Sequence, residues 1–369
     1  MTDTRAAQHL RACIGKVATG PDYSKDLDFD EAYAAMQHIL SGKADPVQAG
    51  IYLIALRMKR ETDTENLATL KAIQDNMTPL SVALDQLVDI ADAYDGWVRG
   101  TNISAFVAPL LAACGLPALC SGVVSVGPKH GVNQHKQLKA AGIDVLMRPA
   151  QVKAALENPA CGWAYLDQSV SCPALNALLP LREQMVKRPL LTTLETLTRP
   201  VQAGRTHLWT GYVHKAYPPV YSTLAMAAGY DSALVVRGVE GGVLPSLQQS
   251  ASTYRTFRDA GAMQHGESDP HALGLNHSRR CLPLPDGLAR RDDGDTPVMD
   301  ALAAAAADAA LAALQGAPGA ARDSLIYGAA LALWHCGVSA SLEQAAADAA
   351  KALDDGSAYQ RFCALRDSH

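Results

Sequence analysis

Residues 87–96 read LVDIADAYDG, a short apolar run that ends in a turn containing a glycine. Leu87 to Ile90 has the length and composition of a buried strand. The stretch from Ser104 to Cys114 is rich in alanine and leucine, which favours a helix. The turn from Asp92 to Gly96 is therefore expected to connect a strand to a helix, as in an α/β sheet.

The same alternation continues along the chain. Met299 to Gln315 is mostly alanine with spaced leucines and predicts a packed helix. His265 to Pro297 is rich in glycine, proline and charged residues and predicts a long irregular connection. Further short apolar runs predict buried strands at Leu116–Cys120, Trp163–Leu166, His207–Val213 and Ala233–Val236.

The N-terminal part carries helix start signals instead of strand signals. Asp28 precedes Glu31 at the spacing of a capping box, and Thr62 to Glu65 repeats that spacing. Asp45 to Gln48 combines a capping residue with a proline at the first helical position. These signals predict a small helical unit that ends near Thr78.

Composition excludes several classes of protein. Hydrophobic residues make up 49% and charged residues 19% of the chain, which is typical of a globular protein. No apolar run is long enough to span a membrane, and the first residues carry no export signal. The eight cysteines form no CxxC pair, which favours reduced thiols and a cytoplasmic location. A net charge of −5 argues against a surface coated with basic charge, although it leaves room for a local basic cleft.

Short motifs spread over the chain resemble those of the anthranilate phosphoribosyltransferases. They follow the family's order from about residue 8 to 365, and this order is more specific than any single motif. The matches are KRET at 59–62 for KGET, NIS at 102–104 for NIST, CPA at 172–174 with Arg182, Arg188 and TRP at 198–200 for HPA…R…RT…TNP, VVRGVEG at 235–241 for VVHGxDG, DPHALGL at 269–275 for DPxxLGL, and DDGS at 354–357 for IDSG.

The resemblance implies an α/β fold with a small helical domain plus a larger α/β domain around a central mixed sheet. Residues 1–78 with 172–198 would form the helical dimerisation domain, and residues 79–171 with 199–369 the α/β domain. Family members are usually homodimers joined through the helical domain. Their active site lies in the cleft between the domains, where ligands commonly bind.

The family binds a phosphoribosyl diphosphate through a glycine-rich cradle, GTGGD, whose backbone amides surround the diphosphate. Asp92 to Gly96 stands at that position here and keeps one glycine. It is either an altered cradle or an ordinary turn. The family's KHGNR segment is replaced at Cys120 to Val124, and Lys129-His130-Gly131 resembles it only out of register. The candidate donor or phosphate-binding residues are Tyr94, Asp95, Gly96, Arg99, Thr101, Asn102, Ser104, Lys129 and His130.

The metal site departs furthest from the family pattern. The family holds magnesium with an Asp-Glu pair, because this ion prefers carboxylate oxygens. Val243 and Leu244 stand at those positions, and aliphatic side chains cannot ligate a metal. No metal ligand and no certain cofactor is therefore predicted, although magnesium belongs to the chemistry that the resemblance implies.

The acceptor side keeps more of the pattern. Arg182 matches the arginine that holds the anthranilate carboxylate in the family, and Arg188 also matches. A guanidinium group suits a carboxylate or a phosphate. Cys172 replaces the family's histidine. A buried structural arginine is the alternative interpretation of Arg182.

Two functions from different classes follow from these residues. The first is a phosphoribosyltransferase-like enzyme whose interdomain cleft binds a phosphorylated or carboxylate small molecule, with unknown catalytic residues and no role in tryptophan synthesis. The second is a non-catalytic protein on the same fold that binds nucleic acid, as a divergent branch of the family with YDG in place of the cradle does. That branch would need a basic groove lined by Arg99, Lys129, Lys136, Arg182, Arg188 and Arg237. A small-anion or metabolite binder is a third option.

Overall fold

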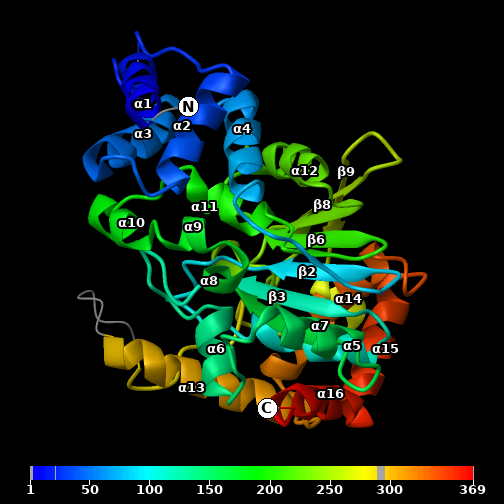
Figure 1. The fold of residues 1–369 in the computed structure, drawn as a ribbon. Helices are drawn as coiled ribbons and strands as arrows, with labels where there is room; N and C mark the ends of the chain where they lie inside the picture. Colours follow the sequence, from blue (N-terminus) through cyan, green and yellow to red (C-terminus); the bar gives the residue numbers. More distant parts are fainter. Residues whose placement is uncertain (1–2, 21, 289–295, 369) are drawn as a thin grey trace.

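A seven-stranded sheet lies at the centre of the larger part of the molecule (Figure 1). The structure is a computed structural model and describes residues 3–20, 22–288 and 296–368. The strand order is β4-β3-β2-β6-β7-β8-β9. The strands are β2 (Leu87–Ala91), β3 (Ala118–Gly122), β4 (Trp163–Asp167), β6 (Thr206–Gly211), β7 (Ser232–Val236), β8 (Ala251–Phe257) and β9 (Gln264–Ser268).

The first five strands of this order are parallel, whereas β8 pairs antiparallel with β7 and β9 pairs antiparallel with β8, so the predicted mixed sheet is confirmed. β2 pairs with β6 in the register Leu87 to Thr206 through Ala91 to Thr210. From this pair the chain proceeds to β3 and β4 on one side and to β7 on the other. The connections that leave β2 and β6 therefore diverge and leave a crevice at the carboxyl ends of the strands.

Four N-terminal helices form a separate helical region, drawn in blue in Figure 1. The Asp28 and Thr62 side chains form capping boxes with Glu31 and Glu65, as the sequence predicts, and the Asp45 side chain accepts from the Gln48 amide. The helices are α1 (Asp3–Val17), α2 (Phe29–Leu40), α3 (Pro46–Lys59) and α4 (Asp63–Gln74).

A later stretch of short helices packs on these four. Cys172, Leu175, Leu190 and Leu194 belong to one hydrophobic cluster with residues of α1 to α4, and this cluster also reaches Leu208 of β6. The division of the chain into two domains at residues 78, 172 and 198 remains a prediction. The short helices are α8 (Gln168–Ser171), α9 (Pro173–Asn176), α10 (Leu179–Met185), α11 (Leu191–Leu194) and the 3-10 helix η2 (Glu195–Leu197).

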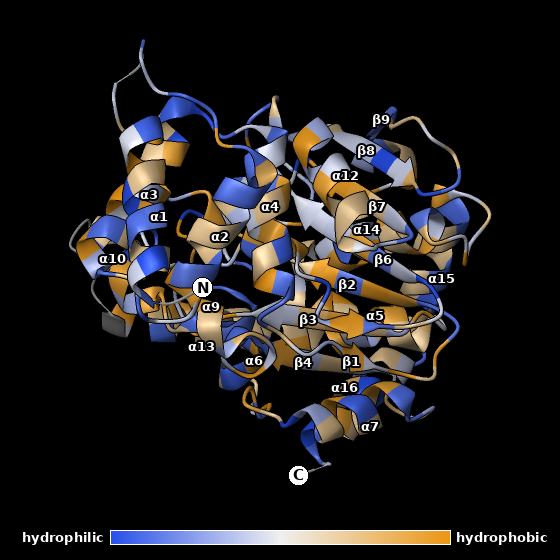
Figure 2. Cartoon of the chain, turned by 45° about the horizontal axis from the view of Figure 1, so that its top comes forward, coloured by the Kyte–Doolittle hydropathy of each residue, from blue (hydrophilic) through white to orange (hydrophobic). Residues whose placement is uncertain are grey.

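The remaining helices pack against the sheet and against one another. α12 contacts β7, α7 contacts β4, and α5 lies between β3 and the C-terminal helices α14 to α16. Figure 2 shows the hydrophobic colouring concentrated on the central strands. The elements are η1 (Ser104–Phe106), α5 (Val107–Ala113), α6 (Gln134–Ala140), α7 (Pro149–Glu157), α12 (Tyr217–Ala228), η3 (Val239–Gly241), η4 (Pro270–Leu273), α13 (Thr296–Leu314), α14 (Ala320–His335), α15 (Leu342–Asp354) and α16 (Ser357–Arg366), with a small parallel sheet of β1 (Leu80–Ser81) and β5 (Val201–Gln202).

The predicted irregular connection from His265 to Pro297 is wrong over its first part. Residues 264–268 form β9, which pairs with β8, and Pro270–Leu273 forms η4. The strand was missed because its first four residues are exposed at the edge of the sheet and carry no apolar run. Residues 289–295 of that connection lie outside the described part of the chain. Within the described ranges, no helix is both long and apolar enough to cross a membrane.

A buried histidine pair at the amino end of β6 and β7 makes stability depend on pH. Arg255 can only donate to His335 Nδ1 (3.4 Å), so His335 Nε2 carries the proton and donates to Ser232 Oγ (2.8 Å). The Ser232 hydroxyl then donates to His207 Nδ1 (2.8 Å). Burial lowers the pKa of His207 from 6.5 to about 4. His207 therefore stabilises the fold fully above pH 6.5, and this contribution is lost as the pH falls toward 4.

We expect His207→Gln, which keeps an acceptor but cannot become charged, to remove this pH dependence. The free-energy difference between wild type and variant should change by about 3 kcal/mol between pH 7 and pH 4. Urea unfolding at several pH values measures it. The difference between wild type and variant is used because Asp89 also makes stability depend on pH. Burial raises the pKa of Asp89 to about 6, so the contribution of Asp89 to the free energy of unfolding increases as the pH falls, opposite to that of His207. Parallel pH profiles for wild type and variant would contradict the assignment.

Candidate functional site

A cavity of about 700 Å³ lies at the carboxyl ends of β2 and β6, facing the helical region. The turn after β2, the loop after β6 and the turn around Glu240 line it from the sheet side. Arg57 of α3 and the residues around α11 line it from the helical side. The cavity therefore occupies the crevice that the diverging connections of β2 and β6 create.

Three glycines allow the loops on the sheet side to meet. A Cβ atom on Gly211 would lie 2.1 Å from the carbonyl oxygen of Gly242, and one on Gly238 would lie 1.7 Å from the same oxygen. Side chains at these positions would collide with backbone. The end of β6 and the turn after β7 can therefore approach closely only because these residues are glycine.

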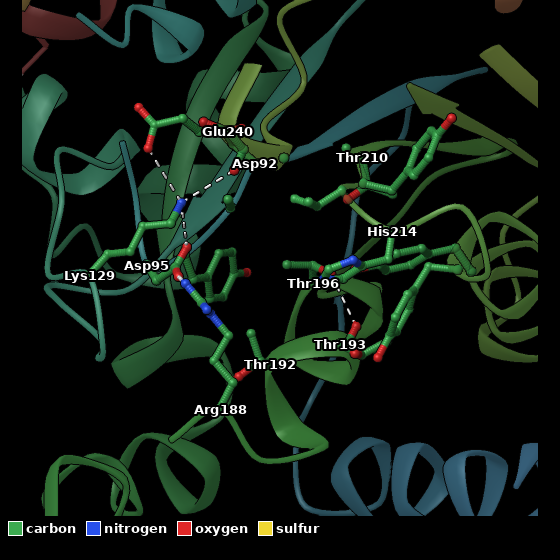
Figure 3. A pocket seen from close by; sticks show the side chains of 18 of the residues that line it. Asp92, Asp95, Lys129, Arg188, Thr192, Thr193, Thr196, Thr210, His214 and Glu240 are labelled. Carbon is green, nitrogen blue, oxygen red and sulfur yellow. Dashed lines mark hydrogen bonds and ion pairs between the residues drawn. The ribbon is translucent and has the colours of Figure 1, made fainter. Parts of the chain in front are cut away.

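Charged side chains form one wall of the cavity (Figure 3). The Asp95 carboxylate accepts from Arg188 Nε at 3.0 Å and from Arg188 Nη2. The Lys129 ammonium group lies 3.6 Å from Asp95 Oδ1 and 3.7 Å from Glu240 Oε2. Lys129 also donates to the carbonyl oxygens of Gly96 (2.9 Å) and Glu240 (3.3 Å). The cations of this wall are thus already neutralised by the protein's own carboxylates.

Glu240 bridges two parts of this wall. Its carboxylate accepts from the backbone amides of Val98 (3.1 and 3.2 Å) and Arg99 (2.7 Å). Its backbone has φ 51° and ψ 19°, the left-handed region that a residue with a Cβ atom adopts only at a cost. The hydrogen bonds to the turn after β2 offset that strain.

Asp92 supports the wall from beneath. It is buried, and it accepts from the Asn102 amide (2.9 Å), the Ser104 hydroxyl (2.6 Å) and the Val243 backbone amide (2.8 Å). These bonds join the turn after β2 to η1 and to the turn after β7. Asn102 and Ser104 therefore hold Asp92 in place and do not reach the cavity themselves.

Hydroxyl and aromatic groups form the opposite wall. In Figure 3, Thr193, Thr196, Thr210 and His214 face the charged side chains across the cavity. The Thr192 hydroxyl has no hydrogen-bond partner within the described residues, and its oxygen is buried although the residue lines the cavity. The aromatic members of this wall are Tyr212, Tyr217 and Tyr221, and the Arg57 guanidinium lies 5.4 Å from the ring centre of Tyr217.

The structure brings some of the predicted donor residues together. Tyr94, Asp95, Arg99 and Lys129 line the cavity, together with Arg188 from the predicted acceptor set. Tyr94 is nearly buried, and its hydroxyl donates to Ser121 (3.2 Å), so it forms part of the wall and does not block the cavity.

Other predicted donor residues lie elsewhere. The Thr101 hydroxyl donates to the Pro283 carbonyl, and His130 is not part of the cavity lining, since its Nε2 lies 3.2 Å from Glu183 Oε2. Gly96 does not line the cavity, but it makes the turn possible. It has φ +70°, and a Cβ atom there would lie 2.6 Å from the Gly131 backbone.

The predicted acceptor role of Arg182 does not match its place in the structure. Both ends of its guanidinium donate to Glu195, at 2.6 and 2.8 Å, and both side chains are buried. Burial alone would lower the pKa of Arg182, but the Glu195 carboxylate raises it above its ordinary value. Arg182 therefore fits the alternative interpretation, a buried structural arginine, because the Glu195 carboxylate accepts from both ends of its guanidinium. Cys172 is also buried and lies outside the cavity lining.

The residues present do not fit magnesium. Val243 and Leu244 are buried and apolar, as the sequence indicates. Asp92, Asp95 and Glu240 line the cavity, and the oxygens of all three already accept hydrogen bonds or pair with cations. The described residues contain no group of three or more His, Cys, Asp or Glu side chains placed to hold a metal ion.

The basic groove that nucleic-acid binding requires is not open. Lys129, Arg182 and Arg188 are paired with carboxylates. Lys136 donates to the carbonyl oxygens of His130 and Gly131, and burial lowers its pKa. Of the six side chains proposed for the groove, Arg99 and Arg237 are exposed. Because Arg182 is buried and Lys136 is held by backbone carbonyls, the six side chains do not form the continuous exposed basic face that a nucleic-acid backbone would follow.

Several lining residues escaped prediction from the sequence. Arg57 lies in the helical region next to the KRET motif, and Thr192, Thr193 and Thr196 follow Arg188 in the stretch LLTTLETLT. A run of threonines beside a retained arginine is a usable signal. Tyr217 gave no such signal in the sequence, because an aromatic residue at the start of a helix is more often part of the core.

Two family models match the chain along most of its length. The model described as the helical bundle domain of a glycosyl transferase family matches residues 11–77. The model described as the a/b domain of that family matches residues 86–359.

Curated proteins and solved structures agree with this match. The anthranilate phosphoribosyltransferase of Bradyrhizobium diazoefficiens is 28% identical over 353 residues, which cover 96% of each chain. That of Thermomicrobium roseum is 28% identical over 358 residues and also covers 96% of each. The Thermus thermophilus enzyme superposes with a TM-score of 0.75 at 24% identity over 98% of this chain and 99% of that one. The Saccharomyces cerevisiae enzyme, solved in complex with PRPP and Mg, has a TM-score of 0.77 at 15% identity over 98% of both. The structural likeness shows the predicted fold.

We expect Glu195→Gln to destabilise the protein by about 3 kcal/mol, because it leaves the Arg182 charge buried without a counter-charge. Urea unfolding measures this. Replacing both partners, as Arg182→Met with Glu195→Leu, should recover much of the loss. As a control, Asp75→Asn breaks an exposed pair with Lys71 and should cost under about 1 kcal/mol. A Glu195→Gln variant as stable as the control would show that the pair does not hold the fold.

Proposed function

The chain belongs to the glycosyl transferase family, and from this premise we propose that it is a phosphoribosyltransferase-like protein whose cavity binds a phosphorylated or carboxylated small molecule. One observation carries the proposal. Arg188 and Lys129 converge on carboxylate oxygens inside the cavity. Groups placed to hold one carboxylate are also placed to hold the oxygens of a ligand's phosphate or carboxylate.

The chemistry of both walls supports this ligand class. Arg188, Lys129 and Arg99 supply positive charge for an anionic group, and such groups stabilise a leaving phosphate as a bond to a ribose carbon breaks. The threonines opposite offer hydroxyls to a sugar, and the tyrosines offer ring faces to an aromatic portion.

We further propose that the chain does not make phosphoribosyl anthranilate with magnesium, although the curated relatives carry the name anthranilate phosphoribosyltransferase. The support is local. Aliphatic side chains stand at the family's metal positions, and each carboxylate of the cavity already has partners. The guanidinium of Arg182, the predicted acceptor arginine, is already paired with the Glu195 carboxylate.

The ligand class is tested by thermal unfolding with ribose 5-phosphate and with phosphoribosyl diphosphate, each with and without magnesium. We expect the phosphorylated sugars to raise the melting temperature by about 2 °C or more at a hundredfold excess over Kd, and magnesium to add nothing. Arg188→Met should abolish the shift. No shift with any phosphorylated or carboxylated compound would refute the proposal.

The same samples, mixed with anthranilate, test the reaction. We expect anthranilate fluorescence to persist in the presence of phosphoribosyl diphosphate and magnesium. Its loss with multiple turnovers would overturn the exclusion of tryptophan synthesis.

We also propose that the chain forms a homodimer through its helical region. Val47, Ile51 and Met58 of α3 are 68%, 41% and 76% exposed, and Ile54 between them is half-buried. Their spacing places them on one helix face, and an exposed apolar stripe of this kind is typical of an interface.

The predicted cytoplasmic location is supported by eight free cysteines.

We expect the double substitution Ile51→Glu with Met58→Glu to convert a dimer into a monomer, because it would bury two carboxylates in the interface. Light scattering after size-exclusion chromatography measures the mass. Leu146→Glu, at an apolar residue that is 58% exposed outside the helical region, is the matched control and should leave the dimer intact. A wild type with the mass of one chain would refute this proposal.

A further inference from the structure

We infer that Asp95 and Glu240 are built-in competitors: they occupy the anion-holding groups of the cavity, and a ligand binds there by displacing them. The inference rests on the proposed function for the class of ligand. It adds a consequence, namely that the site selects for ligands with more negative charge than a single carboxylate.

Asp95 takes the place of a ligand on the two cations. It follows Tyr94 in the turn after β2, at the position where the predicted phosphate cradle would lie. Its side chain is 7% exposed, whereas that of Arg188 is 38% exposed. Arg188 comes from the helical side of the cavity, and its more exposed guanidinium is the partner with room to turn from Asp95 to a ligand.

Glu240 does the same for backbone amides. The Val98 and Arg99 N–H groups donate to no backbone carbonyl within the described residues, and they lie in a loop that follows a strand, where backbone donors bind phosphate. The Glu240 carboxylate accepts from both. Its backbone lies in the left-handed region, and the bonds to these amides and the contact with Lys129 offset the cost of that conformation.

The two carboxylates set the selectivity of the site. A ligand with one carboxylate would exchange one anion for another on Arg188 and gain little. A phosphate ester, and still more a diphosphate, brings more charge and more acceptor oxygens than Asp95 offers. Such a ligand can therefore outcompete Asp95 for Arg188 and Lys129.

Inorganic pyrophosphate without magnesium is the probe, measured by calorimetry at constant ionic strength. We expect Asp95→Asn to bind it about tenfold more tightly than wild type, because Arg188 and Lys129 lose their counter-charge. Glu240→Gly frees the Val98 and Arg99 amides and relieves the backbone strain, since glycine adopts this conformation readily. We expect it to fold and to bind pyrophosphate more tightly than wild type as well.

Two further variants show whether the gain is local. Asp75→Asn removes one negative charge from α4's exposed pair with Lys71, far from the cavity lining, and should leave pyrophosphate affinity unchanged. Adding Arg188→Met to Asp95→Asn should remove most of the gain. Thermal unfolding confirms that each variant is folded, and Asp95→Asn decides the matter if Glu240→Gly does not fold.

Equal pyrophosphate affinity in wild type, Asp95→Asn and Asp75→Asn would overturn the inference. So would a gain that survives Arg188→Met. The outcome is separable from that of the proposed function. If wild type is stabilised by ribose 5-phosphate but Asp95→Asn gains nothing, the competitor role fails and the proposed function stands. If Asp95→Asn gains pyrophosphate binding while wild type responds to no phosphorylated or carboxylated compound, the competitor role stands and the proposed function fails.

Discussion

The parallel pairing of β2 with β6 is the constraint on which the rest of the site depends. Because the chain leaves these neighbours toward opposite sides of the sheet, their carboxyl ends cannot be covered by one another's connections. The opening left between them receives the turn Asp92–Gly96 from one strand and the loop beginning at Tyr212 from the other. Close glycine contacts at Gly211 and Gly242 then bring the Glu240 turn to the same edge.

Electrostatics at this edge are balanced inside the protein. Arg188 arrives from the helical region and meets Asp95 from the sheet, so one ion pair spans the two sides of the cavity. Glu240 holds the amides of the turn, and Lys129 lies between the two carboxylates. In a metal-dependent site these carboxylates would face an ion. Here they pair with the chain's own cations, Arg188 and Lys129.

Arg182 and Arg188 illustrate how the same sequence signal leads to two outcomes. Both match arginines of the resemblance, and both lie in one short segment. Arg182 points into the core and is closed by Glu195, while Arg188 reaches the cavity and meets Asp95. The difference depends on which carboxylate the fold places opposite each guanidinium. The spacing of the two arginines in the sequence does not indicate which carboxylate each of them will meet.

By itself the sequence determined the elements whose causes are local. Capping residues such as Asp28 and Thr62, the apolar runs of the parallel strands and the aliphatic pair Val243-Leu244 act within a few residues of themselves, so their consequences could be predicted. The exposed strand β9 could not be predicted. It is a strand because it pairs with β8, and its own composition gives no strand signal. Only the tertiary structure decided that Asp95, Lys129, Arg188 and Glu240 share one wall and that threonines and tyrosines face them. Asp95 and Arg188 are 93 positions apart and Lys129 and Glu240 are 111 apart. Such long-range charge pairing is set by the packing of strands and helices, not by neighbours in the chain.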